Sequence, residues 1–295
     1  MKKVTKRVLG LVDEETKELT PIPKGKKVAY ETVVETVEDT PFRMNYLFFK
    51  TFGYYYHFFY GDIAKQNLEP QMIVRLMRLA CCLRLNSTGK LMYTERTPLK
   101  YTNEVLSKIL NLKERELRET KKYLIENHLI AINENKEIII SENFIVKGTI
   151  RTDKNTQERD VTRVFENGFQ KIYSQCDPKA HKKLYYLIRL LPYVHVESNS
   201  LCENPLELDP TKIKNISWSG ACDLIGLDKK QKGRLRSYLW DLKIDGEPLI
   251  AEFVNSKGKA VIVNPLMIYK GRDKEKCYSL RMLFQSSYSQ DLNGQ

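Results

Sequence analysis

The sequence predicts a mainly α-helical protein with small β-hairpin wings, an α+β fold made of two tandem winged helix-turn-helix domains. One order of elements occurs twice, in residues 104–148 and again about 120 residues later in residues 221–271. Each stretch is typical of a short helix, a tight turn, a second helix rich in Lys and Arg, and a hairpin. Each then closes on an apolar run that ends in Lys-Gly, at Lys147 and at Lys270.

Composition shifts divide the chain into five segments. We expect an extended N-terminal segment at 1–40, a first winged domain at 41–150, a linker at 151–163, a second winged domain at 164–275 and a tail at 276–295. Within the first segment, residues 8–12 and 18–22 flank an acidic turn and predict a hairpin, and residues 28–37 predict a further strand.

An aromatic block occupies residues 42–60. Its residues Phe48, Phe52, Tyr55 and Phe59 recur at helical spacing, which predicts a helix packed under the first domain. Two further interpretations are a dimer surface and a platform on which bases stack.

A long helix is expected before each helix-turn-helix. Pro70 opens the first, which runs to Leu85, because proline favours the first turn of a helix. Its apolar stripe is Met72, Leu76, Leu79 and Leu83. The corresponding stripe in the second domain is Leu184, Leu187, Ile188 and Leu191.

In the first copy, Asn111 stands where the turn requires a left-handed backbone. The side chains expected to face the core are Leu106, Ile109, Leu110, Leu112, Leu117, Tyr123 and Leu124. Four cations remain on the outer face of the second helix, where they can contact bases and phosphates. These candidate DNA-binding residues are Arg115, Arg118, Lys121 and Lys122.

The second copy repeats the plan with Gly226 in the turn, and Asp228 with Gln231 predicts a capping box. Its expected core stripe is Leu235, Leu239 and Leu242, and its candidate DNA contacts are Lys229, Lys230, Lys232, Arg234 and Arg236. Lys232 falls where the first copy has Leu117, so the two second helices cannot pack identically. Gly233 is unusual inside a helix; it either permits close approach of a DNA backbone or marks a frayed start.

Each copy ends in a predicted hairpin wing. Strands at 130–132 and 138–140 flank the first tip, which carries Lys136 between two glutamates. Strands at 249–254 and 260–263 flank the second tip, which carries Lys257 and Lys259. A ribbon with a basic tip suits phosphate contact, so the acidic first wing is the less suited of the two.

The charge balance favours a polyanionic partner, since the chain carries a formal net charge of +12. No nucleotide-binding glycine loop and no CxxC pair occur, and the four histidines are far apart in sequence. We therefore expect no catalytic residue, no metal, no cofactor and no small-molecule ligand. The six cysteines are expected to be free thiols in the bacterial cytoplasm at the nucleoid, and no secretory or membrane-spanning segment is expected.

From VFENGFQKIYSQ at Val164 to VNPLMIYKG, the chain resembles tandem winged helix-turn-helix replication and regulatory proteins of Firmicute phages and plasmids. The SENFIVKG segment of the first copy is similar to the winged domain of Firmicute plasmid replication proteins, and the resemblance extends over residues 46–271. It implies a mobile-element protein that binds an origin or operator through the second helices and wings. The acidic first wing departs from this pattern.

Together these features predict a sequence-specific double-stranded DNA-binding protein, acting as a transcription regulator or replication initiator. Two alternatives use the same elements. One is a winged-helix module for protein–protein interaction or homodimer formation, and the other is an RNA-binding protein.

Overall fold

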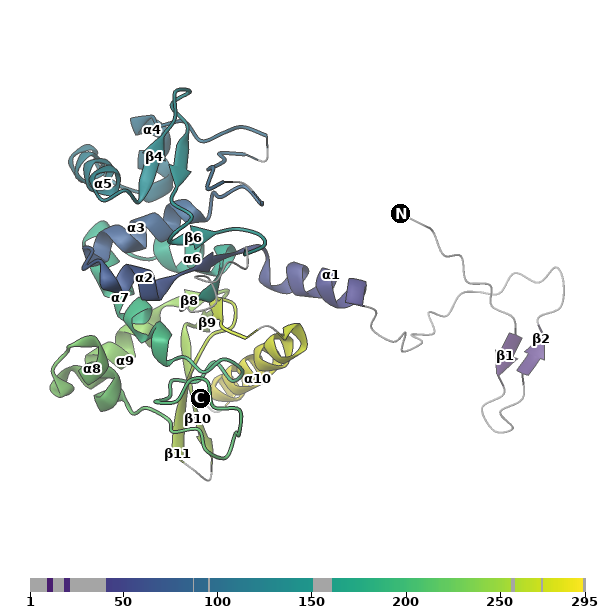
Figure 1. The fold of residues 1–295 in the computed structure, drawn as a ribbon. Helices are drawn as coiled ribbons and strands as arrows, with labels where there is room; N and C mark the ends of the chain where they lie inside the picture. Colours follow the sequence, from purple (N-terminus) through teal and green to yellow (C-terminus); the bar gives the residue numbers. More distant parts are fainter. Residues whose placement is uncertain are drawn as a thin grey trace. The chain divides into compact units, whose positions relative to one another are not determined.

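The computed structural model describes residues 10–12, 19–21, 41–86, 88–94, 96–150, 161–255, 258–271 and 273–293 (Figure 1). The chain forms two compact units, residues 1–40 and 41–295. In the first, β1 (Gly10–Val12) pairs with β2 (Leu19–Pro21) in antiparallel fashion, which confirms the predicted hairpin. The strand predicted at residues 28–37 lies outside the described residues.

Residues 41–295 mix helices with small antiparallel sheets, so the predicted α+β class is confirmed. The α-helices are α1 (Pro41–Phe52), α2 (Tyr60–Lys65), α3 (Pro70–Ala80), α4 (Asn103–Leu110), α5 (Glu114–Glu126), α6 (Glu166–Ser174), α7 (His181–Leu190), α8 (Trp218–Ile225), α9 (Lys232–Asp241) and α10 (Lys274–Asn293). The 3-10 helices among the described residues are η2 (Pro178–Ala180), η3 (Leu191–Tyr193) and η4 (Lys229–Gln231). The strands are β3 (Tyr55–Phe58), β4 (Ile130–Ile132), β5 (Ile138–Ile140), β6 (Ile145–Val146), β7 (Thr162–Phe165), β8 (Lys243–Ile244), β9 (Glu247–Pro248), β10 (Ile250–Asn255), β11 (Gly258–Val263) and β12 (Ile268–Tyr269).

A four-stranded antiparallel sheet joins the two sequence repeats, in the order β12-β7-β3-β6. In each repeat, the first strand of the sheet is hydrogen-bonded to the last: β3 to β6 in the first repeat, and β7 to β12 in the second. The two first strands, β3 and β7, also pair with each other. The Lys-Gly endings found in the sequence therefore follow the two outer strands of one shared sheet.

The register of this sheet is that of a two-fold arrangement. His57 pairs with Val146 in the first repeat, and Arg163 pairs with Tyr269 in the second. These two equivalent residues, His57 and Arg163, also pair with each other. An approximate two-fold axis thus passes through this pair. Helices α3 and α7, which are equivalent under it, pack together between α4–α5 and α8–α9 (Figure 1).

The predicted aromatic helix is too long. Helix α1 ends at Phe52, and Tyr55 lies in β3 instead of continuing the helix. Gly53 breaks the helix with a φ of 76°, a left-handed conformation that glycine adopts readily. Burial then alternates along β3, with Tyr56 and Phe58 in the core and Tyr55 on the other face. Period-two burial of this kind indicates a strand.

The two long lead-in helices also end earlier than predicted. Helix α3 begins at Pro70 as expected but ends at Ala80, and Leu83 is buried in a β-bridge to Leu91. Helix α7 ends at Leu190, and Leu191 opens the 3-10 turn η3. Pro192 follows directly and cannot donate the backbone hydrogen bond that a longer α-helix would need.

The predicted linker and the predicted tail flank the second repeat. Residues 151–160 lie outside the described part of the chain, and β7 begins at Thr162. Most of the expected tail is helix α10, whose Arg281 forms a buried two-pronged ion pair with Glu247 of β9. In the part of the chain that the structure describes, no helix is long and apolar enough to cross a membrane.

Candidate nucleic-acid interface

Two units project from the shared core, α4–α5 and α8–α9, and each is a pair of helices joined by a tight turn (Figure 1). The predicted turn residues adopt the left-handed backbone, with φ of 50° at Asn111 and 73° at Gly226. Side chains cap the first helix of each unit, Thr102 in one and Ser217 in the other. Each cap accepts a hydrogen bond from a first-turn amide, which sets where these helices begin.

The predicted core faces of these units are confirmed. The fully buried members are Leu106, Leu110, Leu112, Leu117, Leu124, Leu235, Leu239 and Leu242, and Ile109 and Tyr123 are partly buried. The Tyr123 hydroxyl also accepts a hydrogen bond from the amide of Glu69 at 2.7 Å, which ties α5 to the start of α3. The second helix of each unit therefore presents its charged side chains outward.

The cations of α5 are compensated within the helix and its neighbours. Three of them form ion pairs four residues apart: Arg115–Glu119 at 3.0 Å, Arg118–Glu114 at 3.2 Å and Lys122–Glu126 at 3.8 Å. The Lys121 ammonium donates to Asn103 at 2.7 Å and lies 4.0 Å from the centroid of the Tyr101 ring. Partial burial lowers the pKa of Lys121. With as many acidic as basic side chains, α5 offers a polyanion little net attraction.

The first wing, β4–β5, is also compensated. Lys136 is exposed at its tip, with a left-handed φ of 56°. The neighbouring carboxylate of Glu137 lies 2.9 Å from the Lys90 ammonium and 3.6 Å from that of Lys100. Hydrogen bonds from Asn133 and Lys90 hold the pKa of Glu137 below its usual value. The acidic character that the sequence indicates is thus partly neutralised by cations outside the wing.

The cations of η4–α9 form a different pattern. Lys229 pairs with Asp223 at 3.0 Å, and Arg236 pairs with Glu252. Lys230, Lys232 and Arg234 are exposed, and none has an acidic partner among the described residues. We call these three residues the free cation cluster.

The start of this helix differs in one respect from prediction. The Asp228 side chain accepts a hydrogen bond from the Lys230 amide at 2.8 Å, as a cap does. The reciprocal bond from the Gln231 side chain does not form within the described part of the chain, and a 3-10 turn precedes α9. The expected difference in packing is confirmed, because Lys232 is exposed while Leu117 is buried.

Glu252 of β10 links the second wing to the helices, a role that the sequence did not indicate. Its carboxylate accepts a hydrogen bond from the Trp218 indole at 2.8 Å and pairs with Arg236. Lys259 of β11 lies 4.0 Å away, and Lys257 is outside the described residues. Partial burial raises the pKa of Glu252, but the hydrogen bonds from Trp218 and Arg236 outweigh this and leave it lowered.

A buried arginine between the repeats was also not indicated by the sequence. Arg75 of α3 is 4% exposed and donates to Thr120 of α5 at 2.7 Å and to the His181 ring of α7 at 3.5 Å. Burial and the Arg75 charge lower the pKa of His181 to about 4.

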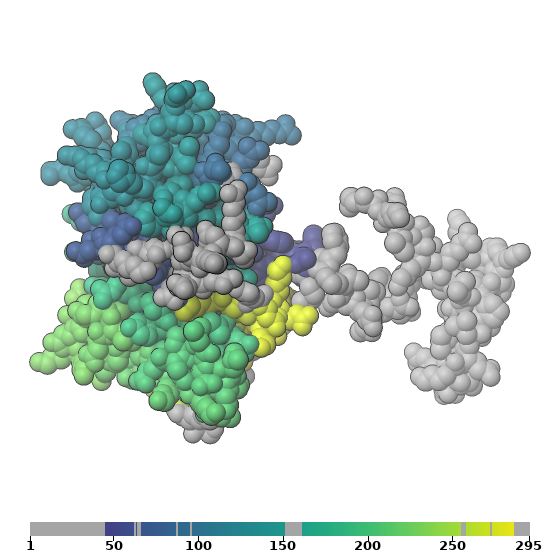
Figure 2. Space-filling view, in the orientation of Figure 1, coloured from purple at the N-terminus to yellow at the C-terminus, as the bar shows by residue number. Residues whose placement is uncertain are grey.

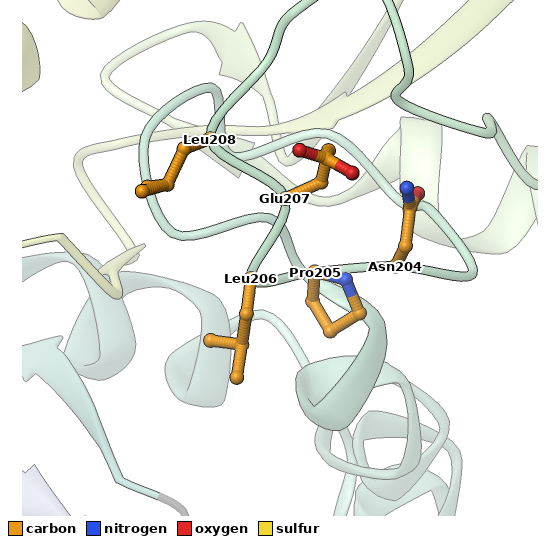
Figure 3. Close-up of a pocket in the computed structure, with 5 residues that line it drawn as sticks. All are labelled: Asn204, Pro205, Leu206, Glu207 and Leu208. Carbon is orange, nitrogen blue, oxygen red and sulfur yellow. The ribbon is translucent and has the colours of Figure 1, made fainter.

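Among the described residues no group of three His, Cys, Asp or Glu side chains could hold a metal ion. His195 is buried, and its Nε2 atom lies 2.7 Å from the Glu207 carbonyl oxygen, so it fixes a loop. This loop borders an open hollow of about 490 Å³, with Leu206 and Leu208 extending from the backbone (Figure 3).

The candidate residues thus fall into three places: the compensated α5 with its wing, the free cation cluster with its two paired neighbours, and the second wing. The chain matches no protein-family model, no curated protein and no solved structure.

Proposed function

We propose that this chain is a sequence-specific double-stranded DNA-binding protein that uses η4–α9 and the hairpin β10–β11 as one winged helix-turn-helix. The observation that carries the proposal is the free cation cluster. Lys230, Lys232 and Arg234 are exposed and lack acidic partners at the start of a helix that follows a left-handed turn. In this motif the N-terminal part of the second helix enters the major groove.

The surroundings of the cluster suit a duplex. Lys259 is exposed on the hairpin strand beside it and can reach a phosphate. Gly233 lies within the cluster, and a side chain added there would meet nothing within 4 Å. The glycine therefore has no packing role inside the chain, and its lack of a side chain lets a DNA backbone come closer.

The α4–α5 unit with its wing β4–β5 supports a second role. It has the same order of elements, but its cations are paired with acidic or polar side chains. A neutral surface favours contact with protein over contact with phosphates, so we assign this unit to protein contacts, including a homodimer. Both units then belong to one tandem winged-helix protein, as the resemblance to phage and plasmid proteins implies.

The biological role that fits is binding to an operator or origin of a mobile element, without an enzymatic step. Binding of RNA by the free cation cluster is the alternative. An A-form helix has a major groove too deep and narrow for side chains to read, so an exposed helix of this kind favours DNA.

The test is selection of bound fragments from the DNA of the element and its host, followed by nuclease protection. The proposal predicts a protected duplex site that survives a large excess of unrelated DNA. Absence of any protected site, or tighter binding of duplex RNA than of the selected fragment, would contradict it.

A further inference from the structure

A second surface, distant in sequence from the free cation cluster, carries exposed aromatic rings. Tyr46 is 60% exposed, Phe49 is 42% exposed and Tyr54 is 58% exposed. Tyr46 and Phe49 are three residues apart on α1 and so share one face of the helix. The Phe49 ring centroid lies 5.9 Å from that of Tyr54, which leads into β3. We call these three residues the aromatic platform; in Figure 2, α1 reaches the surface beside α10.

Cations border this platform. Lys50 is exposed on α1. The Lys274 ammonium lies 5.5 Å from the Phe49 ring centroid, and the Arg163 guanidinium lies 5.4 Å from that of Tyr55. Burial and the charge of Arg163 lower the pKa of Lys274, so these two cations are near each other. None of the three cations has a carboxylate partner in the part of the chain that the structure describes.

The combination favours a ligand with flat rings and negative charge. An apolar protein surface would leave the three cations uncompensated, and burying unpaired charge is costly. The faces of bases in a duplex are already stacked on one another, whereas the bases of a single strand are free to stack on tyrosine and phenylalanine. Helix α1 and Tyr54, the residue just before β3, provide such a surface here.

We propose that the aromatic platform and its three cations, Lys50, Arg163 and Lys274, bind single-stranded DNA. Bases stack on the exposed rings of Tyr46, Phe49 and Tyr54, and the cations contact the phosphates. Stacking and charge would serve an RNA strand equally, and the choice of DNA rests on the proposed function. The site is separate from the free cation cluster, so one chain can hold a duplex and an opened strand.

The experiment measures binding of a fluorescent oligo-dT of about 20 nucleotides to the full chain by anisotropy. Changing Tyr46→Ala together with Tyr54→Ala is expected to weaken binding at least about tenfold. The double change to Phe keeps both rings and is expected to retain the affinity. Tyr93→Ala is the matched control, because Tyr93 is 55% exposed on a loop elsewhere and its loss is expected to change nothing.

Reversal of the free cation cluster separates the two proposals: it is expected to abolish duplex binding and to leave oligo-dT binding intact. Three results would overturn the platform assignment. The first is oligo-dT affinity that the double Ala variant, folded to the same Tm, does not change. The second is sedimentation that shows a dimer for the wild type and a monomer for the double Ala variant, which would assign the rings to contact with a second copy. The third is tighter binding of oligo-U than of oligo-dT.

Discussion

At Gly233, packing within the chain does not require a glycine. Glycine costs a helix about 1 kcal/mol relative to alanine, and no atom lies within 4 Å of the position of an added Cβ. We therefore expect Gly233→Ala to stabilise the protein by up to about 1 kcal/mol, because alanine has less backbone entropy than glycine to lose when the chain folds. We also expect duplex affinity to fall several-fold, since the methyl group would face the DNA backbone. Thermal melting and anisotropy titration check both, and unchanged affinity would indicate only a weak helix start.

His57 and His181 make stability depend on pH. Burial lowers the pKa of each to about 4, with added repulsion from Arg163 and Arg75 respectively. In the unfolded chain both would titrate near 6.5, so between these values the unfolded state binds more protons than the folded state. Stability is thus complete above pH 6.5 and falls as pH drops, by on the order of 2 kcal/mol per histidine at pH 5.

Denaturant titrations at several pH values check this dependence. The double variant His57→Gln and His181→Gln should show a flatter profile between pH 7 and pH 5. An identical slope in the wild type and the variant would show that other groups dominate.

Neither histidine stood out in the sequence, because burial and a nearby arginine arise from contacts between distant segments. Local signals such as Asn111 and Gly226, by contrast, were sufficient to predict the turns.

At the scale of elements, Glu252 couples the second wing to α8 and α9. Changing Glu252→Gln keeps an acceptor for Trp218 but removes the charge that holds Arg236. We expect a loss of about 1 kcal/mol in stability, since hydrogen bonds to charged groups are the stronger ones. Binding to unrelated duplex should strengthen, because a carboxylate near the phosphates is gone and Arg236 is released. The ratio of specific to unrelated binding should fall; a ratio that stays constant would remove Glu252 from the interface.

Sequence periodicity predicted the elements that are local in origin. The hairpin strands of the first wing, 130–132 and 138–140, match β4 and β5. The aromatic helix was overextended because Phe48, Phe52 and Tyr55 share helical spacing, whereas the alternating burial of β3 depends on its pairing with β7. Pairing partners about 100 residues away leave no local trace.

At the scale of the molecule, the two repeats fold as one body around a common core. Strand β3 of the first repeat pairs with β7 of the second, and α3 packs on α7. We expect fragments 41–150 and 161–295 to lack a cooperative melting transition when separate, because each exposes an unpaired strand edge and an apolar helix face. Mixed in equal amounts, they should recover it. A sharp transition in either fragment alone would contradict this account.

The approximate two-fold arrangement could not be predicted from the repeat alone. The sequence indicated two similar units and a polar linker, which is equally compatible with two independent domains. Only the register through the His57–Arg163 pair shows that the units share a sheet. That arrangement places two equivalent second helices on one chain with different charge: the cations of α5 are compensated, whereas in α9 only Arg236 has an acidic partner among the described residues.

We propose that the free cation cluster, and not α5, contacts the duplex. The measurement is the salt dependence of binding to the selected duplex for two charge-reversal variants. One carries Lys230→Glu, Lys232→Glu and Arg234→Glu, and its matched control carries Arg115→Glu, Arg118→Glu and Lys122→Glu. Each phosphate contact contributes about 0.9 to the slope of log affinity against log salt. We predict a slope reduced by about 2 to 3 in the first variant and unchanged in the second; equal slopes in both variants, or a loss only in the second, would contradict the account.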